Sequence, residues 1–180
     1  GIAMPTLHWS GVAMMGALLL GSCERPPQGQ ERYAPQSPAP DTAPRREVLR
    51  RAIVPPPEAA SARLFVHVGD FNDPDKEFIE PAGRRLSEQQ RKVFEEALTV
   101  VGYDRAPHAV AACFVPHHFL RYYDRAGQQV GEIAICFCCG GVSAKPDMVG
   151  PVPTGVGDIQ IEFGAKLQSV IEAMGLPTNV

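Results

Sequence analysis

The sequence predicts a small single domain of the α+β class, in which a central antiparallel β-hairpin or sheet is packed by two helices. Two strand-like runs flank a turn signal at residues 124–127, and two other segments carry apolar residues at helical spacing. Near residue 62 the composition changes from proline-rich to regularly patterned. We therefore expect the folded domain at residues 62–180, behind a disordered tether.

The first expected elements are one strand and one helix. Residues 62–68, ARLFVHV, alternate and contain β-branched and aromatic side chains, which is typical of a strand. A helix is expected over residues 88–101. Ser87 is its expected N-cap, because Gln90 three positions later completes a capping-box pattern. Gly102 predicts the C-terminal end of this helix.

A long β-hairpin is expected next, with strands at residues 109–123 and 128–138. The loop between them, residues 124–127, ends in glycine, where a hairpin loop needs a positive φ. Residues 159–163 predict a further strand. Residues 165–174 predict a final helix, because their apolar positions recur at helical spacing.

The hairpin carries most of the cysteines. If its strands pair without a bulge, Cys113 lies opposite Cys138. Side chains alternate along a strand, so Cys136 and Cys138 share a face with Cys113, whereas Cys139 points to the other face. Three interpretations of this arrangement stay open.

The first interpretation is structural. Cys113 forms a disulfide with Cys138 or Cys136, because the β-carbons of directly opposed residues lie within disulfide reach. The four cysteines of this region permit three pairings, and they are Cys113, Cys136, Cys138 and Cys139.

The second interpretation is a metal site for zinc or copper, because thiolates and imidazole suit zinc or cuprous copper. The candidate ligands are three cysteines and two adjacent histidines: Cys113, Cys136, Cys138, His117 and His118. A straight strand places residues 113 and 117 about 13 Å apart, so the site requires a bend at Pro116. In the third interpretation, Cys136 and Cys138 form a reactive dithiol.

The N-terminal segment indicates export. Residues 11–20 are apolar and uncharged, and the run is too short to cross a membrane but typical of a secretory signal. The sequence Leu20-Gly21-Ser22-Cys23 that follows resembles the lipobox of bacterial lipoproteins. The resemblance implies a signal peptide at residues 1–22 and a lipidated cysteine, Cys23. In that class an aspartate after the cysteine signals inner-membrane retention, so Glu24 favours the outer membrane, with the chain facing the periplasm.

Residues 23–61 are predicted to be the tether. Nine of the 18 prolines lie between Pro26 and Pro57, and such a composition buries too little apolar surface to offset the entropy of ordering. Within it, residues 45–53, RREVLRRAI, predict either a short basic helix or a solvated linker.

Composition and motifs narrow the function. The net charge of −3 excludes a typical nucleic-acid-binding protein, and the chain has no nucleophile elbow, H-E-x-x-H or phosphate-loop pattern. Residues 113–139 resemble a motif in small uncharacterised proteins of bacterial envelopes, from which no activity follows. We therefore expect a lipid-anchored binding protein whose partner is another protein or a soft metal ion. The alternatives are a periplasmic thiol oxidoreductase and an immunity protein against a periplasmic toxin.

Overall fold

The structure, a computed structural model, describes residues 43–69, 77–107 and 113–180. In these ranges the chain forms two antiparallel sheets and two helices, which confirms the α+β class. The predicted signal peptide and Cys23 lie outside the described residues. Within the described part of the chain, no helix is long and apolar enough to cross a membrane.

The larger sheet has five strands in the order β3-β2-β5-β6-β7. In that order they are β3 (Arg84–Arg85), β2 (Ser61–Val66), β5 (His118–Tyr123), β6 (Gln129–Cys136) and β7 (Gly141–Lys145). The predicted strand at 62–68 is confirmed as β2. β7 was not predicted, because its five residues begin within a Gly-Gly pair and carry little apolar alternation.

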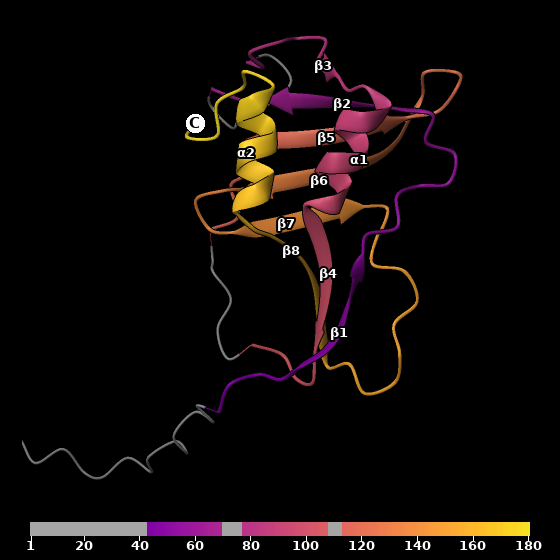
Figure 1. Ribbon diagram of the computed structural model, residues 1–180, viewed down its shortest axis with the longest axis vertical. Coiled ribbons are helices and arrows are strands. Elements are labelled where there is room, and N and C mark those ends of the chain that lie inside the picture. Colours follow the sequence, from indigo (N-terminus) through magenta and orange to yellow (C-terminus); the bar gives the residue numbers. More distant parts are fainter. Residues whose placement is uncertain (1–42, 70–76, 108–112) are drawn as a thin grey trace, which may run out of the picture. The chain divides into compact units, whose positions relative to one another are not determined.

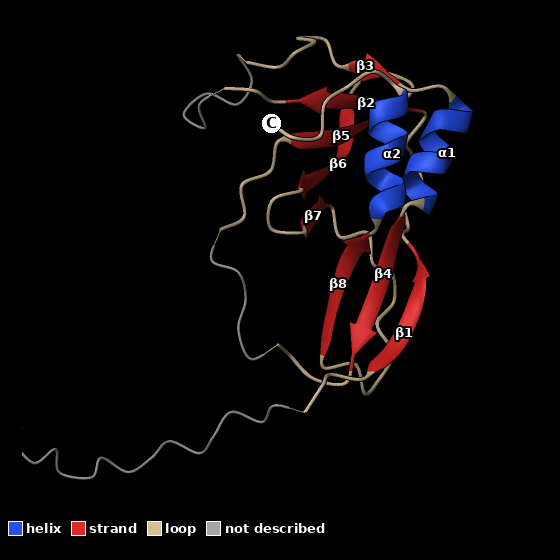
Figure 2. Ribbon diagram, turned by 60° about the vertical axis from the view of Figure 1, so that its left-hand side comes forward, coloured by secondary structure: helices blue, strands red, loops and turns tan. Residues whose placement is uncertain are grey.

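Both helices pack on the same face of this sheet (Figures 1 and 2). They are α1 (Glu88–Glu96) and α2 (Ala165–Ala173). The core lies between the helices and the sheet, where Phe94 of α1 and Ile171 of α2 meet Leu120 and Ile133 of the central strands, all four fully buried. The other face of the sheet carries neither helix.

The smaller sheet has three strands in the order β1-β4-β8. They are β1 (Glu47–Ala52), β4 (Leu98–Tyr103) and β8 (Asp158–Phe163). Figure 1 shows these strands running across the direction of the larger sheet. Val100 of β4 and Ile161 of β8 belong to the same core as the helices, so the two sheets share one hydrophobic interior. The predicted strand at 159–163 is confirmed as β8.

β1 corrects the prediction for the tether. Residues 45–53 are neither a basic helix nor a solvated linker, because Glu47–Ala52 pairs antiparallel with β4. Ile53, directly after the strand, is buried in the core. The folded part of the chain therefore begins before residue 62. β1 is an edge strand, and its charged side chains suit an edge position.

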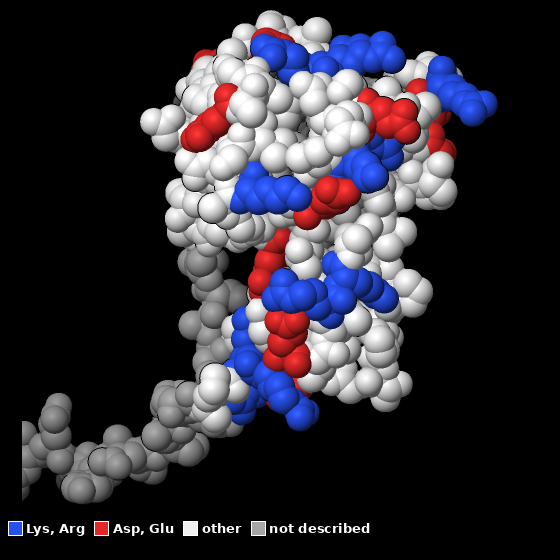
Figure 3. Space-filling view, in the orientation of Figure 1, with Lys and Arg blue, Asp and Glu red and all other residues white. Residues whose placement is uncertain are grey.

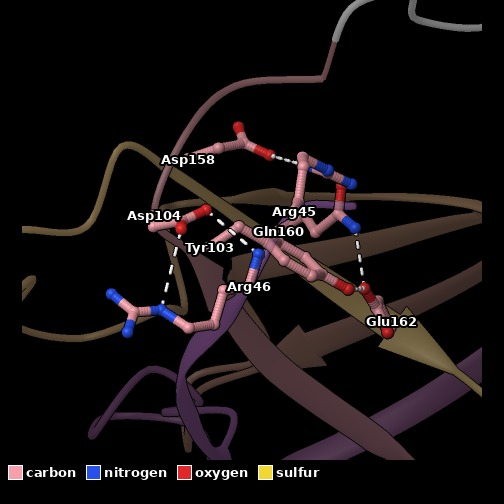
Figure 4. Close-up of polar contacts among 7 residues, drawn as sticks. All are labelled: Arg45, Arg46, Tyr103, Asp104, Asp158, Gln160 and Glu162. Carbon is pink, nitrogen blue, oxygen red and sulfur yellow. Dashed lines mark hydrogen bonds and ion pairs between the residues drawn. The ribbon is translucent and has the colours of Figure 1, made fainter. Parts of the chain in front are cut away.

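A polar network ties the start of this segment to the smaller sheet (Figure 4). Arg45 Nη1 lies 2.7 Å from Asp158 Oδ2, and the Arg45 guanidinium lies 4.0 Å from the centre of the Tyr103 ring. The Tyr103 hydroxyl donates to Glu162 Oε1 at 2.5 Å, and Gln160 Nε2 donates to the same oxygen at 2.7 Å. The contacts join β4 and β8 to Arg45, which lies just before β1.

The first helix begins as predicted and ends early. Ser87 Oγ accepts from the Gln90 backbone N–H at 3.1 Å, and Gln90 Oε1 accepts from the Ser87 N–H at 2.9 Å, so the capping box is confirmed. The predicted end at residue 101 is wrong, because the chain becomes β4 at Leu98. The β-branched run at residues 99–101 favours a strand. Gly102 lies within β4 (Leu98–Tyr103) and does not end the helix.

The hairpin is confirmed in outline, but its register is wrong by two positions. Tyr123 pairs with Gln129. A bulge between Tyr122 and Tyr123 then shifts the pairing of the rest of β5, so that His118 pairs with Ile135. The first strand begins only at His118, and residues 113–117 precede it without strand structure. The predicted strand residues 109–112 lie outside the described residues. Cys113 is therefore not a cross-strand partner of Cys138.

Candidate functional site

Three cysteines converge where β6 gives way to β7. β6 ends at Cys136, residues 137–140 form a turn, and β7 begins at Gly141, which pairs with Cys136. Gly140 has a φ of +69°, a conformation that side-chain-bearing residues rarely adopt. The turn carries Cys138 and Cys139 back over the strand end. The Sγ atoms of Cys136, Cys138 and Cys139 all lie within 4.8 Å of one another. We call these three residues the thiol cluster.

The cluster corrects the prediction for Cys139. Strand alternation would place Cys139 on the face opposite Cys136 and Cys138. That alternation stops at Cys136, where the strand ends, and the turn brings Cys139 to the same side. The sequence signal for this was the Gly-Gly pair directly after Cys139, which is typical of a turn.

The three thiols differ in exposure. Cys136 is 1% exposed, Cys139 is half-buried and Cys138 is exposed. The Sγ atoms of Cys136 and Cys138 are 3.0 Å apart. The cluster thus has a buried inner sulfur and an open outer side from which a ligand can approach.

The acidities of the thiols differ as well. Burial raises the pKa of the Cys136 thiol, but hydrogen bonds from Cys138, Cys139 and the Val115 backbone outweigh burial and lower the pKa to about 7. Hydrogen bonding to Cys136 raises the pKa of Cys138 to about 11. The same contact to Cys136, followed by burial, raises the pKa of Cys139. Cys136 is therefore the most acidic thiol of the cluster.

The two histidines predicted as ligands are engaged elsewhere. His117 Nδ1 lies 3.1 Å from the carbonyl oxygen of His67, and His118 Nε2 lies 2.8 Å from that of Pro177. A carbonyl only accepts, so each of these ring nitrogens donates. Neither histidine belongs to the group of ligand atoms within 4.8 Å, and nor does Cys113, which is exposed. Of the five predicted ligands, the structure brings together two, and it adds Cys139.

A cavity of about 240 Å³ adjoins the cluster. Cys138 lines it together with His117, His118 and Phe137. The His118 ring meets the Phe137 ring edge-on, with centroids 4.9 Å apart. The exposed sulfur therefore faces a small recess with aromatic and imidazole walls, although the histidines do not complete the cluster.

The strand register that favoured a cross-strand disulfide is wrong, whereas disulfide formation itself stays a prediction. All four described cysteines are free thiols. The cross-strand opposition that favoured a Cys113–Cys138 bridge is absent, because β5 begins five residues after Cys113. Oxidation of any cysteine pair stays a prediction.

The donor set decides which chemistry the cluster suits. Zinc–sulfur bonds of about 2.3 Å in a tetrahedral arrangement separate sulfurs by roughly 3.8 Å. The cluster, with its sulfurs within 4.8 Å, needs only small side-chain movements to reach that spacing. Three thiolates suit soft ions such as cuprous copper, and for zinc they leave a fourth position for another ligand.

Comparison with known proteins adds no further assignment. No protein-family model, no curated protein and no solved structure matches the chain. The function is therefore argued from the geometry of the chain itself.

Proposed function

We propose that the protein is a binding protein of the bacterial cell envelope that holds a soft metal ion, zinc or cuprous copper, in its thiol cluster. A single observation carries the proposal: the sulfurs of Cys136, Cys138 and Cys139 lie within 4.8 Å of one another. Sulfur is the donor that soft ions prefer, and this turn presents three sulfurs together.

The surroundings of the cluster support the proposal. Backbone N–H groups of Val115 and Cys139 bond to the Cys136 sulfur, and such bonds stabilise a thiolate ligand and orient it. Cys138 is exposed, so an ion can enter and leave without unfolding the domain. This combination favours exchange of the ion with solvent or a partner over permanent burial.

Native mass spectrometry of the full-length, reduced protein tests the metal site. One zinc or cuprous ion per chain is expected under native conditions and none after denaturation. Cys139→Ser is expected to weaken binding strongly, because it removes one of the three donors. Cys113→Ser is the matched control and is expected to bind normally. An undiminished adduct in Cys139→Ser, or no adduct in the wild type, would overturn the proposal.

The envelope location is a separate part of the proposal. It rests on the lipobox resemblance at Leu20-Gly21-Ser22-Cys23, which implies acylation of Cys23. Each buried methylene of an acyl chain contributes about 0.8 kcal/mol to membrane binding, and durable anchoring needs more than one chain. Labelling with acyl precursors in a bacterial host is expected to disappear in Cys23→Ala. Labelling that persists in this variant would sink the anchoring claim and leave the metal site untouched.

A thiol oxidoreductase is the second candidate, favoured by the 3.0 Å between the sulfurs of Cys136 and Cys138. In such a reaction the two thiols would reduce a substrate disulfide to two thiols and form a bond between their own sulfurs, losing two protons and two electrons. The residue with the lowered pKa is, however, the buried Cys136. A substrate would meet Cys138 first, whose pKa is raised and which is a poor nucleophile at neutral pH.

Turnover separates these two candidates. Reduction of a model disulfide by the metal-free protein, lost in Cys138→Ser, would favour the oxidoreductase. Absence of turnover together with a metal adduct would favour the binding protein. The immunity-protein interpretation stays a prediction, because no feature of the described residues bears on a toxin.

A further inference from the structure

A row of charged side chains crosses the larger sheet on the face that carries neither helix. Arg85 of β3 lies directly opposite Arg63 of β2, and Arg63 lies opposite Arg121 of β5. The row continues through Glu132 of β6 to Lys145 of β7. Opposed residues on antiparallel strands point to the same face, with β-carbons about 4.5–5.5 Å apart. Three arginines therefore stand side by side on three neighbouring strands.

The charges in the row are not balanced at its β3 end. Glu132 Oε2 accepts from Arg121 Nε at 2.8 Å, so the one carboxylate of the row serves the third arginine. Arg63 Nη1 donates to the carbonyl oxygen of Ala82 at 2.8 Å, a contact that leaves its charge uncompensated. Among the described residues, Arg85 has no ion-pair partner, and it is exposed. Like charges directly opposite each other destabilise a sheet, so an anion bound between Arg63 and Arg85 would relieve a repulsion.

A hollow lies at this end of the row. Its volume is about 490 Å³, and Arg63, Arg85 and Arg125 line it together with Ser61 and Tyr123. Arg125 comes from the β5–β6 loop, is exposed, and has no ion-pair partner among the described residues. A volume of this size lies within the range of small-ligand sites. Three guanidinium groups from three different elements thus surround one space.

One acidic residue also lines the hollow. Asp124 Oδ1 accepts from the Gln128 backbone N–H at 2.8 Å, which is a contact within the β5–β6 loop. Its carboxylate therefore serves the loop, and three positive charges stand against one negative charge around the hollow.

The distribution of charge differs on the helix side. Figure 3 shows that side, where Lys and Arg alternate with Asp and Glu over the helices and the smaller sheet. Figure 2 shows the helices on one side of the larger sheet only. Leu64 and Leu120 are buried in the core beneath the helices, and side chains alternate along a strand, so their neighbours Arg63 and Arg121 point to the other side. Ion pairs such as Arg91–Glu95 at 2.7 Å belong to the helix layer.

We propose that the hollow beside Arg63, Arg85 and Arg125 is a binding site for a phosphate group. A guanidinium group offers parallel N–H donors that match phosphate oxygens in pairs. The hydroxyl of Ser61 offers a further hydrogen-bond donor in the hollow. The open side of the hollow leaves room for a ligand larger than phosphate itself. This site is independent of the thiol cluster, which lies at the other end of the hairpin strands.

The phosphate could come from a soluble polyphosphate or from a lipid headgroup. Both present the same chemistry to the arginines, and the experiment distinguishes them. Isothermal titration of the full-length protein with inorganic triphosphate measures the soluble ligand. Sedimentation with vesicles of phosphatidylglycerol in phosphatidylcholine measures the lipid, with pure phosphatidylcholine vesicles as background.

The variant Arg85→Gln/Arg125→Gln removes two of the three charges without touching the buried core. A charge-assisted hydrogen bond is worth enough for about a tenfold effect per arginine, so binding is expected to weaken on the order of a hundredfold. Lys92→Gln is the matched control, because Lys92 is an exposed cation on α1, on the helix side. It is expected to bind like the wild type.

The outcomes are distinct. Triphosphate binding that is lost in the double variant and kept in Lys92→Gln supports a soluble ligand. Vesicle binding with the same variant pattern, in the absence of triphosphate binding, supports a lipid headgroup. Equal losses in the double variant and in Lys92→Gln would mean non-specific attraction and would overturn the site. Failure of the wild type to bind either probe would also overturn the site. Thermal unfolding of each variant, compared with that of the wild type, verifies that the variant is folded.

Discussion

The sulfur of Cys136 lies 3.0 Å from the sulfur of Cys138, yet Cys136 is buried and Cys138 is exposed. The pKa of Cys136 is lowered to about 7, whereas that of Cys138 is raised to about 11. The thiol that ionises most easily is thus the one that solvent does not reach. A reactive cysteine needs both a thiolate and access to solvent. In this pair, Cys136 has the lowered pKa and Cys138 has the access.

The first prediction concerns thiol labelling in the metal-free, reduced protein at neutral pH. Cys113 is exposed and lies outside the cluster, so iodoacetamide is expected to modify it before the three cluster cysteines. Cys136→Ser is expected to accelerate labelling of Cys138, because the contact that raises its pKa is gone. Peptide mass spectrometry over time measures each rate. Faster modification of Cys136 than of Cys113 would contradict this arrangement.

The same arrangement predicts a thiolate step in the ultraviolet absorbance. Because hydrogen bonds hold the pKa of Cys136 near 7, absorbance at the thiolate band is expected to rise through neutral pH by the amount of one thiolate. The step should vanish in Cys136→Ser and stay in the matched variant Cys113→Ser. A first step only above pH 8 in the wild type would show that the Cys136 thiol is not acidified.

The third prediction is a loss of stability in mild acid. Burial lowers the pKa of His118 below 6.5, its ordinary value, although the hydrogen bond to Pro177 partly opposes this. Below pH 6.5 the unfolded chain takes up a proton at this position while folded His118 stays neutral, so the contribution to stability falls. It is fully present above 6.5 and is lost as the pH falls through the folded pKa. The slope from this group is at most about 1.4 kcal/mol per pH unit.

Urea unfolding between pH 7.5 and 5 measures this dependence. His118→Gln keeps a side-chain donor for the Pro177 carbonyl and removes the titration, so its unfolding midpoint should change less with pH than that of the wild type. Gln89→Ala, a change at an exposed, uncharged residue of α1, is the control and should retain the wild-type slope. A His118→Gln slope equal to that of the wild type would assign the acid sensitivity to other groups.

The fourth prediction tests the start of α1. Ser87→Ala removes the side-chain acceptor of the capping box, and loss of such a cap costs about 1 kcal/mol. Gln90→Ala removes the reciprocal contact. Because the two contacts act together, the double variant should lose less than the sum of the single losses. Gln89→Ala, an exposed neighbour outside the capping box, is expected to change the unfolding midpoint little.

The capping box also explains which parts of the fold were predictable. Ser87 and Gln90 are three residues apart, and the signal for the helix start is complete within that window. The β5–β6 hairpin is local as well, and its loop was placed correctly around residues 124–127. Its register was not, because the bulge next to Tyr122 depends on how the loop closes and leaves no mark in the apolar pattern.

The thiol cluster was half predictable for the same reason. Strand alternation predicted that Cys136 and Cys138 share a side. Their sulfurs do lie 3.0 Å apart, but β6 ends at Cys136, so the turn at residues 137–140 brings Cys138 there. The direction of Cys139 depends on the turn before β7, a strand that the sequence did not indicate. A cluster that forms at a turn is set by backbone reversal, which residue spacing alone does not reveal.

β1 is the largest feature missed, and it leads to the fifth prediction. Its partner β4 lies some fifty residues later, and the segment has the arginines and prolines of a linker, so only the tertiary pairing makes it a strand. Ile53, 6% exposed, and Val54, 51% exposed, are adjacent β-branched apolar residues that differ strongly in exposure. If residues 47–53 belong to the folded domain, Ile53→Ala should lower the free energy of unfolding by about 2–4 kcal/mol through the cavity it leaves. Val54→Ala should lower it by a few tenths. Urea unfolding, with a denaturant slope that is the same in both variants, measures the two losses. Two small and equal losses would contradict the assignment of residues 47–53 to the folded domain.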